Sequence, residues 1–261
     1  MSWFEWQDAP AGDYAVLGDP VSHSRSPQMH MAAYDALGVP WVYRAVRVPV
    51  EEFDSAVARL ESIGYKGLNC TVPLKEAAFR WASETDGTTK RIGAANTLDL
   101  KTGQGTNTDA PGFMATFHSG EPVLVLGAGG TARAFLVALD EAGYDVRLWN
   151  RTADKAYRLV DELSLSAEVV LCPDLEGVAA VVNTTSASLQ GEPLDIDWSR
   201  AQSGALAYEA AYGRSPFLES ARAANMETID GLPLLVEQGA LAITFWTGLV
   251  PDRSVMMDAV R

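Results

Sequence analysis

A four-residue apolar run followed by a glycine-rich turn constrains the fold of this chain more than any other feature. Val123–Leu126 has no polar alternation, so it predicts a strand buried on both faces, as in a parallel sheet. Gly127, Gly129 and Ala132 follow with the spacing G-x-G-x-x-G/A. The glycines permit a tight turn and close approach of a pyrophosphate, and the small third residue lets the next helix pack on the strand. The pattern predicts a dinucleotide-binding βα unit, with a plain tight βα turn as the alternative.

The next strand ends in residues that distinguish between dinucleotides. Asp145–Trp149 predicts a parallel strand, and Asn150, Arg151 and Thr152 follow it, with Lys155 one helical turn further. An NAD-binding unit normally places a carboxylate here, where it accepts hydrogen bonds from ribose hydroxyls. A guanidinium can instead bind a 2′-phosphate through two parallel hydrogen bonds and stack on the adenine. The pattern favours NADP(H) over the alternative, a strand that ends in solvated polar residues.

The composition excludes several classes of partner. Asp and Glu outnumber Lys and Arg by 34 to 20, and the net charge of −14 repels nucleic-acid backbones and anionic lipids. We therefore expect neither a nucleic acid nor a membrane as partner. The first residues carry acids and tryptophans rather than a basic segment before an apolar core, so a cytoplasmic protein is expected. Cys70 and Cys172 are too few for a zinc site or a disulfide framework, and we expect two small buried side chains and no metal.

The first part of the chain predicts an α/β sheet domain. Strands are expected at Tyr14–Gly18 and Trp41–Val48, each followed by an amphipathic helix that ends at a glycine. Shorter strands follow, and a helix at Pro111–His118 leads into the dinucleotide-binding part. The predicted fold class is therefore α/β, with an N-terminal domain and a Rossmann-like doubly wound domain.

Two serines precede the first helix. Ser26 is predicted to be the N-cap and Pro27 the first helical residue, so capping is sufficient to explain Ser26. Capping does not explain Ser24. Two hydroxyls beside a helix N-terminus, after the carboxyl end of a strand, match the place where open α/β sheets bind ligands.

Further polar side chains lie where other short strands end. Asn69, Thr71 and Lys75 surround a loop broken by proline, and Asn96 and Asp109 accompany the short strands that follow. A lysine in the first turn of a helix opposes the helix dipole, which favours a functional role for Lys75 over an exposed lysine.

A long helix is predicted at Pro233–Leu249, near the end of the chain. Gln238 lies four residues after Leu234 and shares the apolar stripe of that helix. From the spacing alone, Gln238 fits a hydrogen-bonded core amide and a ligand-binding amide equally well.

Taken together, these polar stretches resemble the shikimate dehydrogenase family along nearly the whole chain, in order and with compatible spacing. The matching pieces are His23-Ser24-Arg25-Ser26-Pro27, Asn69-Cys70-Thr71-Val72-Pro73-Leu74-Lys75, Gly93-Ala94-Ala95-Asn96-Thr97, Asn107-Thr108-Asp109, the glycine turn, Asn150-Arg151-Thr152 and Gly231-Leu232-Pro233-Leu234-Leu235-Val236-Glu237-Gln238. Each piece is short, but their joint occurrence is specific.

The resemblance implies an oxidoreductase that uses NADP(H) to reduce 3-dehydroshikimate reversibly to shikimate in aromatic amino-acid (chorismate) biosynthesis. It implies a substrate-binding domain formed by residues 1–110 and 232–261, and an NADP-binding Rossmann domain formed by residues 111–231. The implied partner is the small-molecule substrate, and the implied enzyme is a monomer or a homodimer.

The resemblance also implies roles for single residues. Lys75 and Asp109 would be the catalytic pair, and Ser24, Ser26 and Tyr212 would hold the substrate carboxylate. The residues implied to bind the ring hydroxyls are Asn69, Thr71, Lys75, Asn96, Asp109 and Gln238. The residues implied to bind the cofactor are Gly127, Ala128, Gly129, Gly130, Thr131, Asn150, Arg151, Thr152, Lys155, Thr184, Ala210 and Gly231.

Two other functions compete with this interpretation. One is a quinate/shikimate dehydrogenase with relaxed substrate or cofactor use, and Arg151 argues against a preference for NAD in such an enzyme. The other is a cofactor-binding paralogue without turnover, which predicts the loss of Lys75 or Asp109, whereas both are present. The chain also departs from the family pattern at Glu209-Ala210, where Asp-Met is common, so the packing around the nicotinamide is expected to differ.

Overall fold

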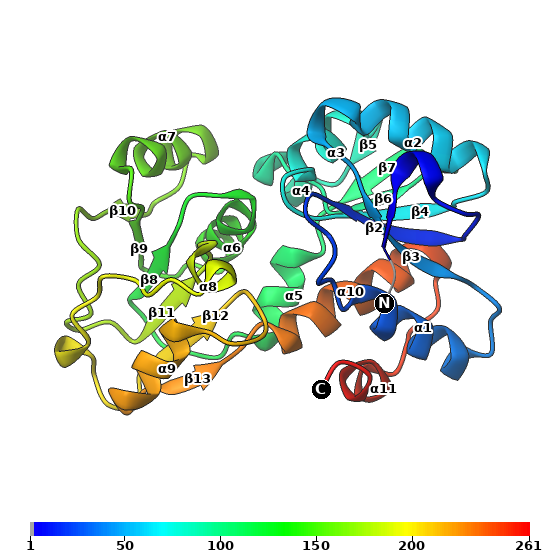
Figure 1. Cartoon of the computed structure of the whole chain (residues 1–261). Helices are drawn as coiled ribbons and strands as arrows, with labels where there is room; N and C mark the ends of the chain where they lie inside the picture. Colours follow the sequence, from blue (N-terminus) through cyan, green and yellow to red (C-terminus); the bar gives the residue numbers. More distant parts are fainter. Residues whose placement is uncertain (1–2) are drawn as a thin grey trace. The chain divides into compact units, whose positions relative to one another are not determined.

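The computed structural model describes residues 3–261, which fold into two compact units. One unit comprises the described residues up to Gly112 together with Leu235–Arg261, and the other comprises Phe113–Leu234. Helices α5 (Asp109–Thr116) and α10 (Leu232–Thr247) each cross a boundary between the units. Both units are α/β, which confirms the predicted fold class (Figure 1).

Within the described residues, the first unit contains a mixed seven-stranded sheet with the order β1-β3-β2-β4-β6-β7-β5. The first four strands in this order are parallel, whereas β6 is antiparallel to both of its neighbours. The strands are β1 (Trp3–Glu5), β2 (Tyr14–Gly18), β3 (Tyr43–Arg47), β4 (Gly67–Cys70), β5 (Glu84–Thr85), β6 (Thr97–Asp99) and β7 (Gln104–Thr106). The helices that begin and end in this unit are α1 (Ser26–Leu37), α2 (Phe53–Ser62), α3 (Lys75–Trp81), α4 (Gly87–Ile92) and α11 (Arg253–Asp258), with 3₁₀ turns at Trp6–Asp8 and Val50–Glu52.

Helices cover both faces of this sheet. In Figure 1, α2 and α3 lie on one face, and α1 and α10 lie on the other. Successive side chains of β2 point to opposite faces of the sheet, as they do along any strand. Leu17 packs with Leu60 of α2 in one buried cluster, and Tyr14 stacks on Trp246 of α10 with 4.6 Å between the ring centroids.

The position of α10 on the sheet is set by one hydrogen bond and two close approaches. Trp246 Nε1 donates to the carbonyl of Leu98 at 2.9 Å. A Cβ added at Gly67 would lie 2.4 Å from that nitrogen, and one added at Gly239 would lie 2.3 Å from Met29 Cε on α1. Glycine at these two positions therefore lets α10 approach both the sheet and α1.

We expect Gly67→Ala to lower the free energy of unfolding by about 1–3 kcal/mol, as overpacking of a filled core does. The added methyl group would displace the Trp246 ring from Leu98. Gly87→Ala is the matched control, because a Cβ there meets nothing within 4 Å. Urea denaturation checks both variants, and an unchanged stability of Gly67→Ala would contradict the role assigned to Trp246.

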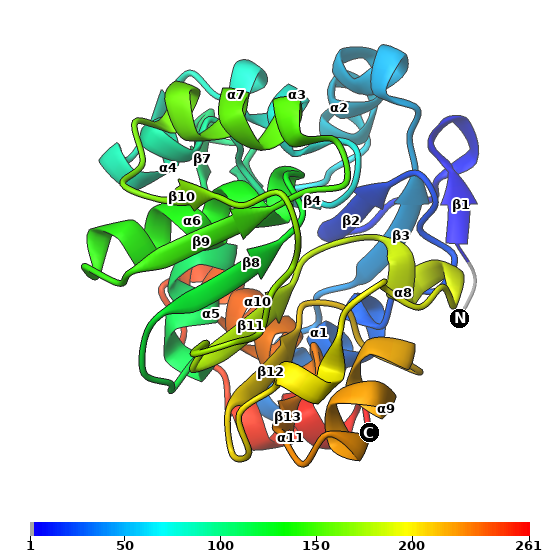
Figure 2. The same ribbon diagram turned by 90° about the vertical axis from the view of Figure 1, so that its left-hand side faces the viewer.

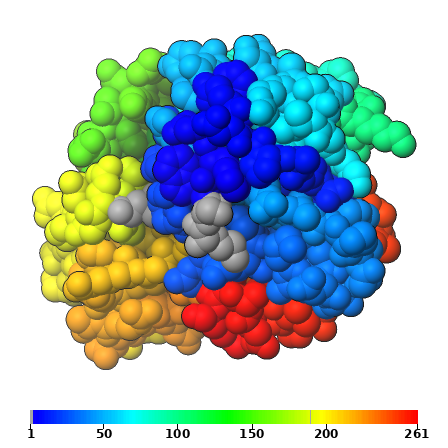
Figure 3. Space-filling model, turned by 45° about the vertical axis from the view of Figure 1, so that its right-hand side comes forward, coloured from blue at the N-terminus to red at the C-terminus, as the bar shows by residue number. Residues whose placement is uncertain are grey.

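The C-terminal segment returns to the first helix. Arg25 donates from its guanidinium to the carbonyl of Val260, and α11 packs on α1. In the space-filling view, the red C-terminal residues lie directly against the blue residues of this unit (Figure 3). Helix α1 is thereby held by the C-terminal segment as well as by the sheet.

In the described residues of the second unit, six parallel strands form a sheet with the order β10-β9-β8-β11-β12-β13, and Figure 2 shows them side by side in that order. The order reverses between β8 and β11, as in a doubly wound fold. The strands are β8 (Val123–Leu126), β9 (Val146–Trp149), β10 (Glu168–Val169), β11 (Ala180–Asn183), β12 (Leu206–Glu209) and β13 (Glu227–Ile229). The helices that begin and end in this unit are α6 (Gly130–Glu141), α7 (Ala153–Leu163), α8 (Ala187–Gln190) and α9 (Pro216–Ala223), with a 3₁₀ turn at Trp198–Arg200.

Two predictions about small residues need correction. The structure buries Cys70 but exposes Cys172, because the chain after β10 turns at the surface rather than continuing a buried strand. The side-chain oxygen that meets the backbone at the start of α1 is that of Ser24, which accepts from Ser26 N at 3.3 Å. Ser26 is itself the first residue of the helix, so it is not the N-cap.

Residues 3–261 lack both a membrane-spanning helix and a cluster of metal-ligating side chains. No helix in that range has the length and apolar character that a membrane span requires. No group of three or more His, Cys, Asp or Glu side chains in the same range could hold a metal ion.

Candidate active site

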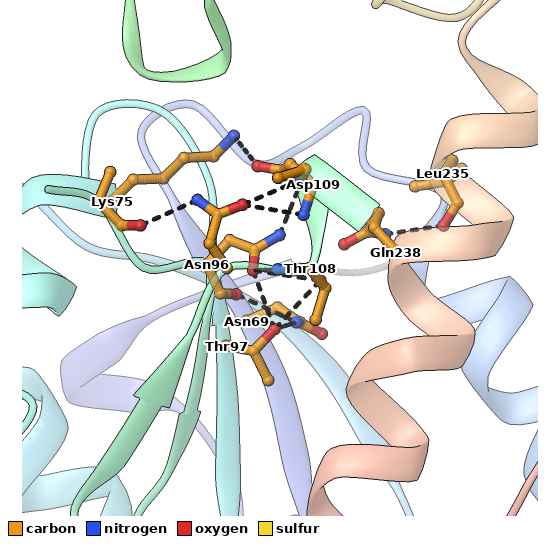
Figure 4. A network of polar contacts seen from close by, with 11 residues as sticks. Asn69, Lys75, Asn96, Thr97, Thr108, Asp109, Leu235 and Gln238 are labelled. Carbon is orange, nitrogen blue, oxygen red and sulfur yellow. Dashed lines mark hydrogen bonds and ion pairs between the residues drawn. The ribbon is translucent and has the colours of Figure 1, made fainter. Parts of the chain in front are cut away.

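A buried ion pair lies at the centre of the candidate site in the first unit. Lys75 is the first residue of α3, Asp109 is the first residue of α5, and Lys75 Nζ lies 2.7 Å from Asp109 Oδ2 (Figure 4). Their exposed fractions are 8% and 6%. An ammonium at a helix N-terminus opposes the helix dipole, so the partner carboxylate is what stabilises it there. The pair holds a cation in a site that is largely shielded from solvent.

Asn96 fixes the orientation of the Asp109 carboxylate. Asn96 Nδ2 donates to Asp109 Oδ1 at 2.9 Å, and Asn96 Oδ1 accepts from the backbone N–H of Thr108 at 2.8 Å. A backbone N–H only donates, so the amide oxygen must face Thr108 and the amide nitrogen must face Asp109. Both carboxylate oxygens of Asp109 therefore have assigned partners, Asn96 and Lys75.

Asn69 lies beneath this pair in the same network. Its amide nitrogen donates to the carbonyl of Asn96 at 3.1 Å and to Thr97 Oγ1 at 3.0 Å. Its amide oxygen accepts from the Tyr43 hydroxyl at 2.7 Å. Burial raises the pKa of Tyr43 well above its ordinary value, so the hydroxyl remains a donor. The carbonyl of Asn96 only accepts, so it determines the orientation of the Asn69 amide, and Tyr43 supplies a donor for the amide oxygen.

Sequence reasoning did not identify Tyr43 or Asn107 as site residues. Asn107 Oδ1 accepts from the backbone N–H groups of Asp109 and Ala110 at 3.0 and 3.2 Å, and Asn107 Nδ2 donates to the carbonyl of Ala94. An Asn two residues before an acid is a helix-start signal that could have revealed this role. No comparable signal marks Tyr43, because a buried strand tyrosine is usual in a core.

Gln238 approaches the site from α10. Its Nε2 donates to the carbonyl of Leu235 at 2.7 Å, and Figure 4 shows the opposite, oxygen end of the amide on the side of the Asp109 network. A Cβ at Gly112 of α5 would lie 3.1 Å from the Gln238 backbone nitrogen, so the two helices touch here. Gln238 is half-buried and has one internal hydrogen-bond partner. The internal bond is a feature of a core amide, and the partial exposure is a feature of a ligand-binding amide.

The three hydroxyl residues of this unit that were expected to bind substrate follow the ends of two neighbouring strands. Ser24 and Ser26 come after β2, and Thr71 comes after β4, which pairs with β2 in parallel. Thr71 is tied to β2 by its backbone N–H, which donates to Leu17 at 2.8 Å. All three therefore lie at the same edge of the sheet. Tyr212 belongs to the second unit, on the loop after β12.

The turn after β8 contains two glycines, Gly127 and Gly129, that are required for different reasons. Gly127 has φ of +108°, and a Cβ there would lie 2.7 Å from Thr184 Oγ1, which donates to the carbonyl of Leu126. Gly129 has an ordinary φ, and a Cβ there meets nothing within 4 Å. The protein itself therefore requires glycine at position 127, whereas the space beside Gly129 is open to a ligand. Ala128, Gly130 and Thr131 complete the turn and the first residues of α6.

The residues expected to bind the 2′-phosphate of the adenine ribose follow β9. Asn150 Nδ2 donates to the carbonyl of Thr152 at 2.8 Å, and α7 begins at the next residue. Arg151, Thr152 and Lys155 are exposed. Two basic side chains beside the N-terminus of α7 form a place suited to an anion.

The loops after β12 and β13 touch through Gly231. Its backbone N–H donates to the carbonyl of Ala211 at 2.9 Å, and a Cβ there would lie 2.5 Å from the carbonyl oxygen of Ala210. Only glycine permits this approach, so the shape of the Ala210–Tyr212 loop depends on Gly231.

Two family models match parts of the chain, and known relatives match most of its length. A model described as the shikimate dehydrogenase substrate binding domain matches residues 16–98, and one described as the shikimate 5′-dehydrogenase C-terminal domain matches residues 231–261. A shikimate dehydrogenase (NADP(+)) from Thermus thermophilus is 40% identical over 260 residues, which cover 95% of this chain and 97% of the relative. One from Methanothrix thermoacetophila is 39% identical, with coverages of 95% and 96%.

Solved structures agree with these sequence matches. The shikimate 5-dehydrogenase of Thermus thermophilus in complex with NADP(H) and shikimate has a TM-score of 0.87 and 38% identity, with 95% of this chain and 98% of that chain covered. The shikimate dehydrogenase of Aquifex aeolicus has a TM-score of 0.90 and 34% identity, with coverages of 96% and 98%. The identity, the coverage and the fold all lead to one conclusion: this chain belongs to the shikimate dehydrogenase family.

Proposed function

We propose that this chain catalyses the reversible, NADPH-dependent reduction of 3-dehydroshikimate to shikimate in aromatic amino-acid biosynthesis. The observation that carries the proposal is the buried Lys75–Asp109 pair, held by Asn96 within a unit of the shikimate dehydrogenase type. The proposal includes a small-molecule substrate, a cytoplasmic enzyme and a monomeric or homodimeric state.

The chemistry assigned to this pair follows from the charge that develops on the substrate. Bound NADPH supplies the hydride that reduces the ring ketone. Negative charge then builds on the ketone oxygen, where the Lys75 ammonium stabilises it and donates a proton. Asp109 holds the ammonium in position and accepts from the neighbouring ring hydroxyl. Burial of the pair strengthens both interactions, because the surrounding medium is poorly polarisable.

The residues of the second unit fit a phosphorylated dinucleotide. The α6 N-terminus and the open space at Gly129 suit a pyrophosphate, and Arg151 and Lys155 suit a 2′-phosphate. Thr184, Ala210 and Gly231 lie on the loops beyond β11, β12 and β13, and we assign them to the nicotinamide half.

The other substrate contacts are assigned by polarity. Ser24, Ser26 and Tyr212 supply neutral hydroxyl donors for the carboxylate, which avoids adding another buried charge. The amides of Asn69 and Gln238, together with Thr71, face the ring hydroxyls in this proposal.

The function is tested by following NADPH absorbance with 3-dehydroshikimate, and in reverse with shikimate or quinate and either oxidised cofactor. We expect rapid turnover with 3-dehydroshikimate and NADPH, and with shikimate and NADP. Faster oxidation of quinate with NAD would replace this proposal with a quinate/shikimate dehydrogenase. Absence of turnover with every pair would favour a non-catalytic paralogue.

We expect Arg151→Ala to raise the KM for NADPH about ten- to a hundredfold, the effect of losing a charge-assisted contact of about 1.5–3 kcal/mol. The constants for NADH should hardly change, because NADH lacks the 2′-phosphate. Arg158→Ala, which removes an exposed arginine further along α7, is the control and should change neither. Steady-state kinetics with both cofactors decide the matter, and equal losses with NADPH and NADH would make Arg151 a structural residue.

A further inference from the structure

The second unit contains a carboxylate that is buried without a cationic partner. Glu209 is the last residue of β12 and its exposed fraction is 0%. Among the described residues, no lysine, arginine or histidine forms an ion pair with it. Burial raises the pKa of this carboxyl above its ordinary value. A buried carboxylate is costly unless donors surround it, so the donors at this position call for an explanation.

Four neutral donors surround Glu209. Oε2 accepts from Ser188 Oγ at 2.5 Å, from Ser215 Oγ at 2.8 Å and from Asn183 Nδ2 at 2.9 Å. Oε1 accepts from the backbone N–H of Ala211 at 3.2 Å. Asn183 ends β11, Ser188 lies in α8, Ala211 follows β12 and Ser215 is the N-cap of α9. One side chain therefore ties together the loops that follow two neighbouring strands.

These two loops lie where the second half of a dinucleotide is expected. Ligands of a doubly wound sheet bind outside the carboxyl ends of the strands at the point where the strand order reverses, which here is between β8 and β11. The glycine turn after β8 and Arg151 after β9 lie on one side of that point. The loops after β11 and β12 lie on the other side, and Asn183 and Glu209 are register partners at their start.

We propose that Glu209 is a positioning residue that holds the β11–α8 and β12–α9 loops in the shape that receives the nicotinamide half of NADP(H). The proposal rests on the use of NADP(H) proposed above. Two further contacts brace the same loops: Thr184 Oγ1 donates to the carbonyl of Leu126 at 2.8 Å, and Gly231 N donates to the carbonyl of Ala211 at 2.9 Å.

An amide cannot replace this carboxylate without a mismatch. Asn183 Oδ1 accepts from the backbone N–H and the hydroxyl of Thr185, at 3.0 and 2.8 Å, so Asn183 Nδ2 must face residue 209. Ala211 N–H also only donates. In Glu209→Gln, the new amide nitrogen must face one of these two donors, whichever way the amide is turned. The serine hydroxyls can rotate, so they are not the source of the mismatch.

The reciprocal change Glu209→Gln/Asn183→Asp restores complementarity. The carboxylate introduced at position 183 keeps one oxygen for the two Thr185 donors and offers its other oxygen to the amide nitrogen introduced at position 209. The amide oxygen at position 209 then accepts from Ala211 N–H. The cluster still contains one carboxylate and keeps about the same volume. The carboxylate now lies at the end of β11 instead of at the end of β12.

The experiment measures dissociation constants for NADPH and for 2′,5′-ADP, which contains the adenine half alone. We expect Glu209→Gln to weaken NADPH binding about tenfold, the effect of one mismatched buried hydrogen bond. Binding of 2′,5′-ADP should be unchanged. The reciprocal double variant should recover most of the NADPH affinity.

Ser188→Ala covers the case in which Glu209→Gln does not fold, because it removes a single donor. It should weaken NADPH binding in the same direction by a smaller factor, with 2′,5′-ADP again unaffected. Equal weakening of NADPH and 2′,5′-ADP, or no recovery in the double variant, would overturn the proposal. Because binding is measured without turnover, a failure of the proposed reaction remains distinguishable from a failure of this role.

Discussion

Lys75→Met is expected to lower kcat by about 10²–10⁴-fold, the usual contribution of a positioned acid–base group. Methionine keeps much of the side-chain volume and removes the ammonium that lies 2.7 Å from Asp109. The KM for 3-dehydroshikimate should change far less, because the ammonium acts mainly on charge that is absent from the bound ketone. Steady-state kinetics with NADPH measure both constants.

A lysine outside the site provides the control for this result. Lys101 is exposed in the turn between β6 and β7, so Lys101→Met should leave kcat and KM as they are. If Lys75→Met keeps the kcat of the parent and only raises KM, Lys75 binds substrate and the proton donor is another group.

Asp109→Asn is expected to lower kcat by about 10²-fold or more, within the same range for acid–base groups, and to raise KM as well. The amide keeps an oxygen for Asn96 Nδ2 but offers no charge to Lys75, so a buried ammonium loses its anion. The substrate hydroxyl also loses an acceptor. Kinetics and a thermal unfolding curve separate this effect from unfolding, and parental kcat in a folded variant would remove Asp109 from the mechanism.

The elements predicted best from the sequence are strands that consist of a short run of apolar residues. Val123–Leu126 and Tyr14–Gly18 are strands with the predicted bounds, because an apolar run of that length has few other stable outcomes. The strand expected at Trp41–Val48 shortens to Tyr43–Arg47, the residues that pair with β2. The strand at Glu227–Ile229 was not predicted, since it is short and polar at its start.

Helix starts were less predictable, because a side chain elsewhere can supply the cap. The helix expected from Pro111 begins at Asp109, since Asn107 Oδ1 accepts from the first two helical N–H groups. That shift of two residues places the Asp109 carboxylate at a helix N-terminus. A local sequence pattern does not reveal which of several polar residues takes the capping role.

The network of the candidate site depends on long-range pairing, which no spacing in the sequence encodes. Asn69 and Asn96 were expected to bind substrate, and the structure adds that each amide is already oriented by internal partners. Tyr43 was missed because it lies in β3, whereas the Asn69 amide that accepts from its hydroxyl lies in β4, on the other side of β2. Glu209 was noted only as a departure from the family pattern, whereas its burial among four donors becomes visible only in the fold.

The central mechanistic claim is that Lys75 and Asp109 act as one unit. The kcat of Lys75→Met/Asp109→Asn, compared with both single variants and the parent, tests it most directly. Residues that act together lose most of their effect when either is removed, so the double variant should be little slower than the slower single variant. Losses that multiply would show that Lys75 and Asp109 contribute independently, and they would contradict the claim.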